Sequence, residues 1–285
     1  MFGDVHEYAP AKINLALRVF PLRPDGYHNI ESIFQQVTLY DELYVTCVGE
    51  GQFCDVYVAD AVLPKENTLT KTYFEFVKIT GIQFGIKVTL VKNIPMGAGL
   101  GGGSSDAAAL INALDKMFQT RLTFQQKKEI ALCVGSDVLF FLAGATALVS
   151  GRGDVVQVIK QRERLWCVLV YPDVHSSTKE GYLLVDEYLE KGDATQYPSF
   201  QELEKMYYDS VKNWRFYNTF TVPLIEKYSE IASAIEDVVS TGASYVQMSG
   251  SGSVVFGIYE SEVVANEALK KMQLKWQHCF VVEFV

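Results

Sequence analysis

The glycine-rich run PMGAGLGGGSS, residues 95–105, is the strongest candidate in this sequence for binding an anion. Glycines let a backbone approach a ligand without side chains in between. The apolar residues that follow recur at the spacing of one helical face, which predicts a helix that begins near Ser104 or Ser105. The first amides of a helix have no partner inside it, and they lie at the positive end of its dipole. The run therefore predicts a phosphate-binding loop.

Other interpretations of this run fit the sequence less well. A flexible linker lacks ordered flanks, whereas residues 85–93 alternate between apolar and polar side chains like a half-buried strand. The run does not end in the Gly-Lys-Ser/Thr of a Walker loop. Gly97, Gly99 and Gly102 satisfy GxGxxG, but the strand is far from the N-terminus and no repeating strand–helix series follows. A dinucleotide-binding fold is therefore disfavoured.

Two ionisable residues in apolar surroundings are candidates for the reaction itself. Lys12 stands in YAPAKINLAL, and Asp137 stands in GSDVLFF. A charge among apolar residues is costly unless it is paired, so we expect the two to pair with each other. A buried carboxylate with a lysine beside it can orient or deprotonate an alcohol, and the lysine can offset negative charge on a transferred phosphoryl group. A purely structural ion pair is the alternative.

The segments around these residues predict an α+β fold of two domains, residues 1–160 and 161–285. Strands of an antiparallel sheet are expected at 37–48 and 53–59, with further strands at 85–93, 145–149, 155–159, 166–172, within 244–259 and at 280–285. Helices are expected at 67–78, from Ser104 onward, and at 123–134, 199–211, 223–239 and 261–272. Strands and helices that are segregated in this way exclude a TIM barrel.

Composition limits the classes of partner. The chain has 285 residues, of which 49% are hydrophobic and 21% charged, as is ordinary for a folded protein. Its net charge of −9 and the lack of a basic stripe argue against nucleic acid. The longest apolar run, residues 138–149, is too short to span a membrane. Five scattered cysteines indicate buried free thiols and a reducing cytoplasm. Among these classes of partner, a small-molecule ligand remains. We expect the protein to bind it in the cytoplasm as a monomer or homodimer.

The string PMGAGLGGGSS resembles the phosphate loop of the GHMP small-molecule kinases, which include galactokinase, homoserine kinase and mevalonate kinase. Four more strings, PAKINLAL, DGYHNI, GSDVLFF and MSGSGSVVFG, occur in the order and spacing of one branch, the 4-diphosphocytidyl-2-C-methyl-D-erythritol kinases. The resemblance is dense over residues 10–154 and returns near 248, while 187–241 carries no motif that aligns. It implies a two-domain GHMP kinase fold, with an N-terminal domain like domain 2 of ribosomal protein S5 and a ferredoxin-like C-terminal layer.

The resemblance also implies a reaction and its residues. Enzymes of this branch use ATP and Mg²⁺ to phosphorylate the 2-hydroxyl of 4-diphosphocytidyl-2-C-methyl-D-erythritol in non-mevalonate isoprenoid biosynthesis. Lys12 and Asp137 hold the positions of the branch's catalytic lysine and aspartate. Asn67 matches a residue near the adenine pocket, although it is equally suited to cap the helix that follows. The ATP loop corresponds to Pro95, Met96, Gly97, Ala98, Gly99, Leu100, Gly101, Gly102, Gly103, Ser104 and Ser105.

Substrate selection is expected at the cytidine end. The resemblance implies a pocket that stacks cytosine between aromatic rings and reads its polar edge. Tyr27 and His28 belong to the Gly-Tyr-His pattern of the branch, and Thr178 and Tyr182 reproduce its aromatic residue four positions after a threonine. A tyrosine in such a turn and a single histidine more often have a structural role, and this role is the alternative for Tyr27 and His28.

Three further positions follow from neighbouring patterns. Asn14, two residues after Lys12, lies on the same face of a strand and is expected to touch the hydroxyl-bearing end of the substrate. The turn SGSGS at 249–253 is expected to lie against the phosphate loop or the substrate diphosphate, and an ordinary hairpin is the alternative. No residue is recognisable as a magnesium ligand. Ser105 and Asp106 are candidates, although an acid in the first helical turn more often serves the helix dipole.

Two other functions remain open at this stage. One is a GHMP kinase that acts on homoserine or mevalonate, against which the Gly-Tyr-His of residues 26–28 argues. The other is a nucleotide-binding regulator that transfers no phosphate. It would be favoured if Lys12 and Asp137 were separated by more than ~6 Å with no room for an alcohol.

Overall fold

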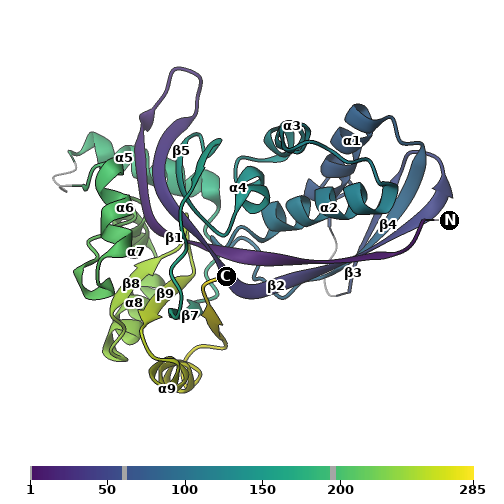
Figure 1. Ribbon diagram of the computed structural model, residues 1–285. Coiled ribbons are helices and arrows are strands. Elements are labelled where there is room, and N and C mark those ends of the chain that lie inside the picture. The colour runs from purple at the N-terminus through teal and green to yellow at the C-terminus, as the bar shows by residue number, and fades with distance from the viewer. Residues whose placement is uncertain (1, 60–62, 193–196) are drawn as a thin grey trace. The chain divides into compact units, whose positions relative to one another are not determined.

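The computed structural model describes residues 2–59, 63–192 and 197–285 (Figure 1). The strands are β1 (Val5–Leu22), β2 (His28–Glu50), β3 (Cys54–Val58), β4 (Phe84–Val91), β5 (Thr146–Gly151), β6 (Val155–Val158), β7 (Trp166–Tyr171), β8 (Tyr245–Met248), β9 (Val255–Tyr259) and β10 (His278–Glu283). The helices are α1 (Thr68–Thr80), α2 (Gly102–Phe118), α3 (Phe124–Val134), α4 (Val138–Ala143), α5 (Thr178–Glu190), α6 (Phe200–Tyr208), α7 (Thr221–Lys227), α8 (Ser229–Ser240) and α9 (Glu262–Met272), with a short 3₁₀ turn at Val211–Asn213.

Contacts group the chain into two compact units, and neither is a continuous half of the sequence. The first contains Met1–Ala11, Leu39–Ile94 and Gly101–Gly144, and the second contains Lys12–Thr38, Pro95–Leu100 and Ala145–Val285. The long strands β1 and β2 contribute to both units. The domain boundary that the sequence predicts near residue 160 remains a prediction.

In the first unit, helices α1 to α4 lie over a sheet that includes β3 and β4 (Figure 1). The expected antiparallel arrangement is correct for β2 and β4, where Val45 pairs with Val88. It is wrong for β3, which pairs with β4 in parallel, Val56 opposite Val88. The reason is the connection, because a crossover that contains a helix, here α1, brings the next strand back in the same direction. Helix α4 was expected only as an apolar run after Asp137.

In the second unit, an antiparallel sheet runs in the order β10-β7-β9-β8. Helices α8 and α9 pack on it through buried side chains such as Ile231, Val238 and Ala265. Strands β5 and β6 form the hairpin predicted around the turn SGRGD. The single helix predicted at 223–239 is wrong: Tyr228 is extended, with φ −123° and ψ 99°, and separates α7 from α8.

The described residues bear on the predictions about membrane spans and cysteines. No helix among them is long and apolar enough to cross a bilayer. All five cysteines are free thiols, but only Cys167 and Cys279 are buried, whereas Cys133 is exposed. In the described part of the chain, no three His, Cys, Asp or Glu side chains gather closely enough to hold a metal ion.

Candidate active site

The glycine run forms a tight loop that leads directly into α2. Gly97, Gly99 and Gly101 have φ angles of 67°, 81° and 71°, which only glycine adopts without strain. Gly101 caps α2, so the helix begins at Gly102, two or three residues before the start predicted near Ser104 or Ser105. The difference arises because glycines carry no hydrophobic period, and the first helical turn is therefore invisible to a pattern of apolar residues.

The start of α2 has the geometry expected of an anion site. The amides of Ser104 and Ser105 donate to the carbonyl of Gly101, at 3.1 and 3.0 Å. The amides of Gly102 and Gly103 precede them and have no partner inside the helix. These donors, together with the helix dipole, make the first turn of α2 suitable for a phosphate.

Two buried oxygen atoms near this turn lack hydrogen-bond partners among the described residues. They are Oγ of Ser105, a residue that is 1% exposed, and Oδ1 of Asp106, which is 3% exposed. An unpartnered buried hydroxyl in the first turn of the helix suits a hard cation that accompanies a phosphate. The expectation that Asp106 lies in the first turn is wrong, because the earlier start of α2 places it in the second.

Asp106 belongs instead to a buried cluster of charges. Lys92 Nζ lies 3.0 Å from Asp106 Oδ2 and also pairs with Asp41, whose side chain is fully buried. A Cβ on Gly102 would lie 3.2 Å from Lys92 Nζ and 3.4 Å from Asp41 Oδ2, so the cluster packs directly against the first residue of α2. Sequence reasoning missed Lys92 and Asp41. The only available signal was that Lys92 and Asp106 flank the glycine run.

Asp41 also holds the residues that precede the glycine run. Its Oδ1 accepts hydrogen bonds from the amides of Asn93 and Ile94, at 2.7 and 2.8 Å. Burial raises the pKa of Asp106 to about 7, although the Lys92 ammonium opposes this shift. Burial alone would lower the pKa of Lys92, but the charges of Asp106 and Asp41 raise it overall. Asp106 therefore titrates close to neutral pH, beside a Lys92 ammonium that its two acidic partners stabilise.

We predict that Asp41→Asn lowers the free energy of unfolding by about 3–5 kcal/mol, the usual cost of breaking a buried ion pair. Asp106→Asn should cost less, because burial raises the pKa of that carboxyl group to about 7, so that its charged form adds less to stability at pH 7. Urea denaturation of the wild type and both variants at pH 7 measures the difference. Equal losses in the two variants would contradict the greater role of the Asp41 carboxylate in the buried ion pair with Lys92.

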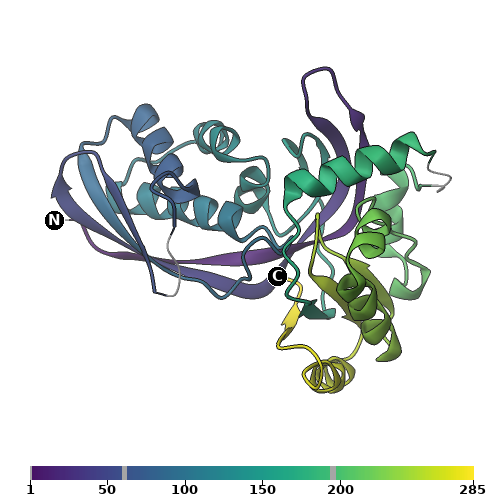
Figure 2. The same cartoon turned by 180° about the vertical axis from the view of Figure 1, so that it is seen from behind.

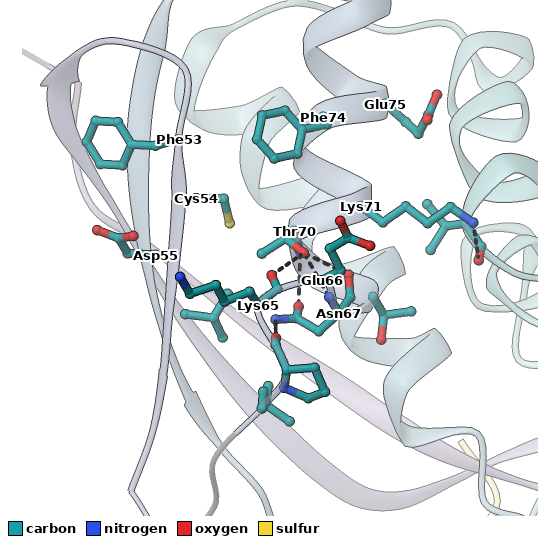
Figure 3. Close-up of a pocket in the computed structure, with 15 residues that line it drawn as sticks. Phe53, Cys54, Asp55, Lys65, Glu66, Asn67, Thr70, Lys71, Phe74 and Glu75 are labelled. Atoms are coloured by element: carbon teal, nitrogen blue, oxygen red, sulfur yellow. Dashed lines mark hydrogen bonds between the residues drawn. The ribbon is translucent and has the colours of Figure 1, made fainter.

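A pocket of about 1190 Å³ opens between β3 and α1 (Figure 3). Asn67 lies in its wall and caps α1: its Oδ1 accepts from the amides of Leu69 and Thr70, and its Nδ2 donates to the carbonyl of Pro64. The capping alternative for Asn67 is thus confirmed, and its place in the pocket is compatible with ligand contact. The pocket is lined by Phe53, Cys54, Asp55, Val56, Leu63, Pro64, Lys65, Glu66, Asn67, Thr68, Thr70, Lys71, Phe74, Glu75 and Val134.

This pocket borders the first turn of α2. Thr68 belongs to its lining, and Thr68 Oγ1 lies 3.4 Å from the position of a Cβ on Gly103. Partial burial raises the pKa of Cys54 to about 12, so this thiol lines the pocket in its neutral form. A partly apolar cavity beside an anion-binding helix start suits a nucleotide, with the base in the pocket and the phosphates at the helix.

Lys12 lies against the glycine loop within the second unit. It is 4% exposed, and its Nζ donates to Asn14 Oδ1 at 2.6 Å and to the Gly99 carbonyl at 3.3 Å. The ammonium also lies 4.7 Å from the centre of the Phe34 ring, a cation–π contact. Asn14 is 1% exposed and donates from Nδ2 to Ser32 Oγ. The predicted shared face of Lys12 and Asn14 is confirmed, and it meets the loop.

The second glycine turn packs on the same loop, as expected. Ser249 Oγ donates to the Gly99 carbonyl at 2.9 Å and accepts from the backbone amide of Asn14 at 3.2 Å. A Cβ on Gly99 would lie 2.1 Å from the Ser249 carbonyl oxygen, which is far too close for two non-bonded heavy atoms. Gly99 is thus required by both its backbone conformation and its neighbour.

Asp137 belongs to the first unit and stands at the N-cap position of α4. Asp137 is half-buried, whereas the sequence predicts a buried carboxylate. The apolar run that follows directs Val138 and Phe140 into the core and leaves Asp137 at the end of the helix. Lys12 belongs to the second unit, and pairing between Lys12 and Asp137 stays a prediction.

The residues predicted to bind cytidine fall into two contacts in the second unit. His28 stacks on Tyr182, with ring centres 4.6 Å apart and planes inclined by 16°, and its Nε2 lies 2.8 Å from Asp186 Oδ1. Tyr27 is 51% exposed, and the Arg152 guanidinium lies 3.4 Å from its ring centre. Sequence reasoning missed Asp186 and Arg152. Asp186 lies one helical turn after Tyr182, which was the only signal for it.

Thr178 is the first residue of α5, the long green helix in Figure 2. Its Oγ1 lies 3.2 Å from Ser251 Oγ, so it contacts the second glycine turn. The structure therefore places Thr178 beside the turn that packs on the phosphate loop, while Tyr182 lies one turn further along the same helix.

Comparisons with known proteins identify the family. The model of the GHMP kinases N terminal domain matches residues 67–145, and that of the GHMP kinases C terminal domain matches residues 197–278. A protein of Treponema pallidum named 4-diphosphocytidyl-2-C-methyl-D-erythritol kinase is 39% identical over 280 residues, which cover 95% of each chain. A protein of Thermotoga maritima with the same name is 41% identical over 262 residues, which cover 90% of this chain and 93% of that one.

Solved structures give the same result. A crystal structure of 4-(cytidine 5'-diphospho)-2C-methyl-D-erythritol kinase matches with a TM-score of 0.84 and 27% identity, over 98% of both chains. Homoserine kinase from Cytophaga hutchinsonii matches with a TM-score of 0.73 over 100% of this chain and 96% of that one, but at 18% identity this likeness concerns the fold alone. The chain therefore belongs to the 4-diphosphocytidyl-2-C-methyl-D-erythritol kinases and has the two-domain α+β fold of the GHMP kinases.

Proposed function

We propose that this protein transfers the terminal phosphoryl group of ATP to the 2-hydroxyl of 4-diphosphocytidyl-2-C-methyl-D-erythritol, giving the 2-phosphate and ADP in non-mevalonate isoprenoid biosynthesis. The observation that carries the proposal is the contact of Lys12 with the Gly99 carbonyl, which places a buried cation on the loop that leads into α2. The 33–41% identity to enzymes named for this substrate supports the choice of alcohol.

We assign ATP to the glycine loop and the neighbouring pocket. The adenine occupies the pocket beside Asn67, and the phosphates accept hydrogen bonds from the amides of the loop and of the first turn of α2, residues 95–105. The unpartnered Ser105 hydroxyl fits a Mg²⁺ ion that accompanies the phosphates. When bound, Mg²⁺ offsets the negative charge of the phosphate oxygens.

We assign the chemistry to two residues. Asp137 orients the 2-hydroxyl and accepts its proton, and the oxygen then attacks the terminal phosphorus of ATP in line with the leaving ADP. Lys12 offsets the charge that spreads over the transferred phosphoryl oxygens. Asn14 is held by Lys12 and Ser32, so it can present a fixed amide to the hydroxyl-bearing end of the substrate.

We assign the cytidine end to Tyr27, His28, Thr178 and Tyr182. We predict that Tyr182→Ala raises KM for this substrate about 5- to 150-fold, since the stacking of a base on an aromatic ring contributes about 1–3 kcal/mol. KM for ATP should stay unchanged. Leu183→Ala is the matched control, because Leu183 is the next residue of α5 and is 57% exposed. An unchanged substrate KM in Tyr182→Ala would remove Tyr182 from the pocket.

The reaction is tested by a parallel assay. Purified protein is incubated with ATP, Mg²⁺ and one of three alcohols: the cytidine diphosphate methylerythritol, homoserine or mevalonate. We expect ADP to form only with the first. ADP formed with homoserine or mevalonate would identify a different GHMP kinase, and no ADP with any of them would favour a nucleotide-binding regulator.

We also propose that the enzyme works in the cytoplasm as a monomer or homodimer. The five free cysteines support a reducing compartment. Light scattering of the purified protein measures its mass directly, and a larger assembly would contradict the proposed state.

A further inference from the structure

Asp186 makes a specific contact with the predicted cytidine pocket but has no assigned role. It lies on α5 four residues after Tyr182, so both side chains share one face of the helix. Its carboxylate lies 2.8 Å from His28 Nε2, and the side chains of Asp186 and His28 are 26% and 7% exposed. The His28 ring in turn stacks on Tyr182. Carboxylate, imidazole and phenol ring thus follow one another in a chain of two contacts.

We propose that Asp186 is a positioning residue for the base-binding platform: it holds the His28 ring flat against Tyr182 and thereby fixes the phenol ring on which the pyrimidine stacks. This inference rests on the proposed function, because the pyrimidine is the cytosine of the substrate. Tyr182 is also contacted by the Phe220 ring edge-on, with centres 5.0 Å apart and an angle of 76°. Two rings and a carboxylate therefore restrict a side chain that would otherwise rotate.

The physical benefit is preorganisation. A ring that is already fixed loses little conformational entropy when a base stacks on it, so more of the stacking energy appears as affinity. The carboxylate does this through the imidazole, because a charge-assisted hydrogen bond at Nε2 fixes the orientation of the His28 ring about twice as strongly as a bond to a neutral amide oxygen. Asp186 acts on substrate binding alone and has no part in phosphoryl transfer.

The proposal predicts a selective change in Asp186→Asn. KM for the cytidine substrate should rise about ten-fold, while kcat and KM for ATP stay within about two-fold of the wild type. Asp186→Glu, which keeps the carboxylate, should recover part of the loss. Glu187→Gln is the matched control, because it removes the same charge from the next residue of α5, which is exposed. It should change none of the three constants.

A double-mutant cycle tests whether Asp186 acts through Tyr182. In a Tyr182→Ala background, Asp186→Asn should raise the substrate KM by less than about two-fold, because the ring that it positions is gone. A full ten-fold effect in that background would overturn the proposal. So would an equal rise of both KM values in Asp186→Asn, which would indicate a general structural defect.

Calorimetric binding of CMP separates this inference from the proposed function, since it needs no turnover. We expect the wild type to bind CMP and Asp186→Asn to bind it about ten-fold more weakly, with Glu187→Gln unchanged. Equal CMP affinity in wild type and Asp186→Asn would overturn the role of Asp186 even if the kinase reaction occurs. Weakened binding in the variant of a protein that phosphorylates none of the alcohols would uphold the role of Asp186 and refute the kinase reaction. Absence of CMP binding by the wild type would overturn the role of Asp186, while the assay with the three alcohols decides the kinase reaction.

Discussion

Asp137→Asn lowers kcat by about 10²- to 10⁴-fold, the usual contribution of a positioned general base, and leaves ATP affinity within about two-fold of the wild type. The reason is that the amide keeps the shape of the carboxylate but cannot accept a proton from the 2-hydroxyl. Asp137 stands at the N-cap of α4 without a side-chain capping bond, so the exchange leaves the helix start intact. Steady-state kinetics and calorimetry with ADP measure the two quantities.

A matched exchange separates this loss from a general defect. Asp115 belongs to the same unit and pairs with Lys127 at 2.8 Å. Asp115→Asn therefore removes an ion-paired carboxylate without touching the glycine loop, and it should lower stability while leaving kcat unchanged. Full activity of Asp137→Asn would remove Asp137 from the mechanism, and so would an equal loss of kcat in both variants.

Gly99→Ala should lower kcat/KM for ATP by about 100-fold or more, because a displacement of about 1 Å at a reacting centre can cost that much. The new Cβ would lie 2.1 Å from the Ser249 carbonyl oxygen, so the loop or the second glycine turn has to shift. The Gly99 carbonyl accepts from Lys12 Nζ, so the shift also displaces the cation on which transfer depends. Thermal melts recorded with the kinetics report the accompanying loss of stability.

Gly242→Ala is the control for backbone strain. Gly242 has φ +85°, close to the +81° of Gly99, but no atom lies within 4 Å of its added Cβ. Both variants pay roughly 1–2 kcal/mol for a left-handed alanine, and only Gly99→Ala adds the collision. If Gly242→Ala lost as much activity as Gly99→Ala, the effect would come from strain alone and the contact with Ser249 would have no role.

The fold was largely predictable where local signals are strong. The helices with polar caps were found almost to the residue: α1 follows Asn67, and α3 follows Thr123, each with a capping box. The failures lie where tertiary context decides. The parallel partner of β3 depends on a crossover connection, and the break at Tyr228 depends on a single extended residue within an apolar pattern. Neither feature can be recognised from the local periodicity of apolar residues.

The candidate site was predictable as far as its motifs reach. The glycine loop, Lys12 and Asn14 meet in the structure because they stand in short strings with recognisable chemistry. The residues that hold them were missed, because their partners are far apart in the sequence. Asp41 is 51 positions from Lys92, and Asp186 is 158 positions from His28. Side chains that act through such distant pairs are found only when the fold brings the partners together.

The most direct test of this account is a crystal structure of the protein with a non-hydrolysable ATP analogue, Mg²⁺ and the cytidine diphosphate methylerythritol. We expect the triphosphate to accept hydrogen bonds from the amides of Gly102 and Gly103 at the start of α2, and the 2-hydroxyl to contact Asp137. A triphosphate bound away from the glycine loop would contradict the account, as would a 2-hydroxyl that contacts neither Asp137 nor Lys12.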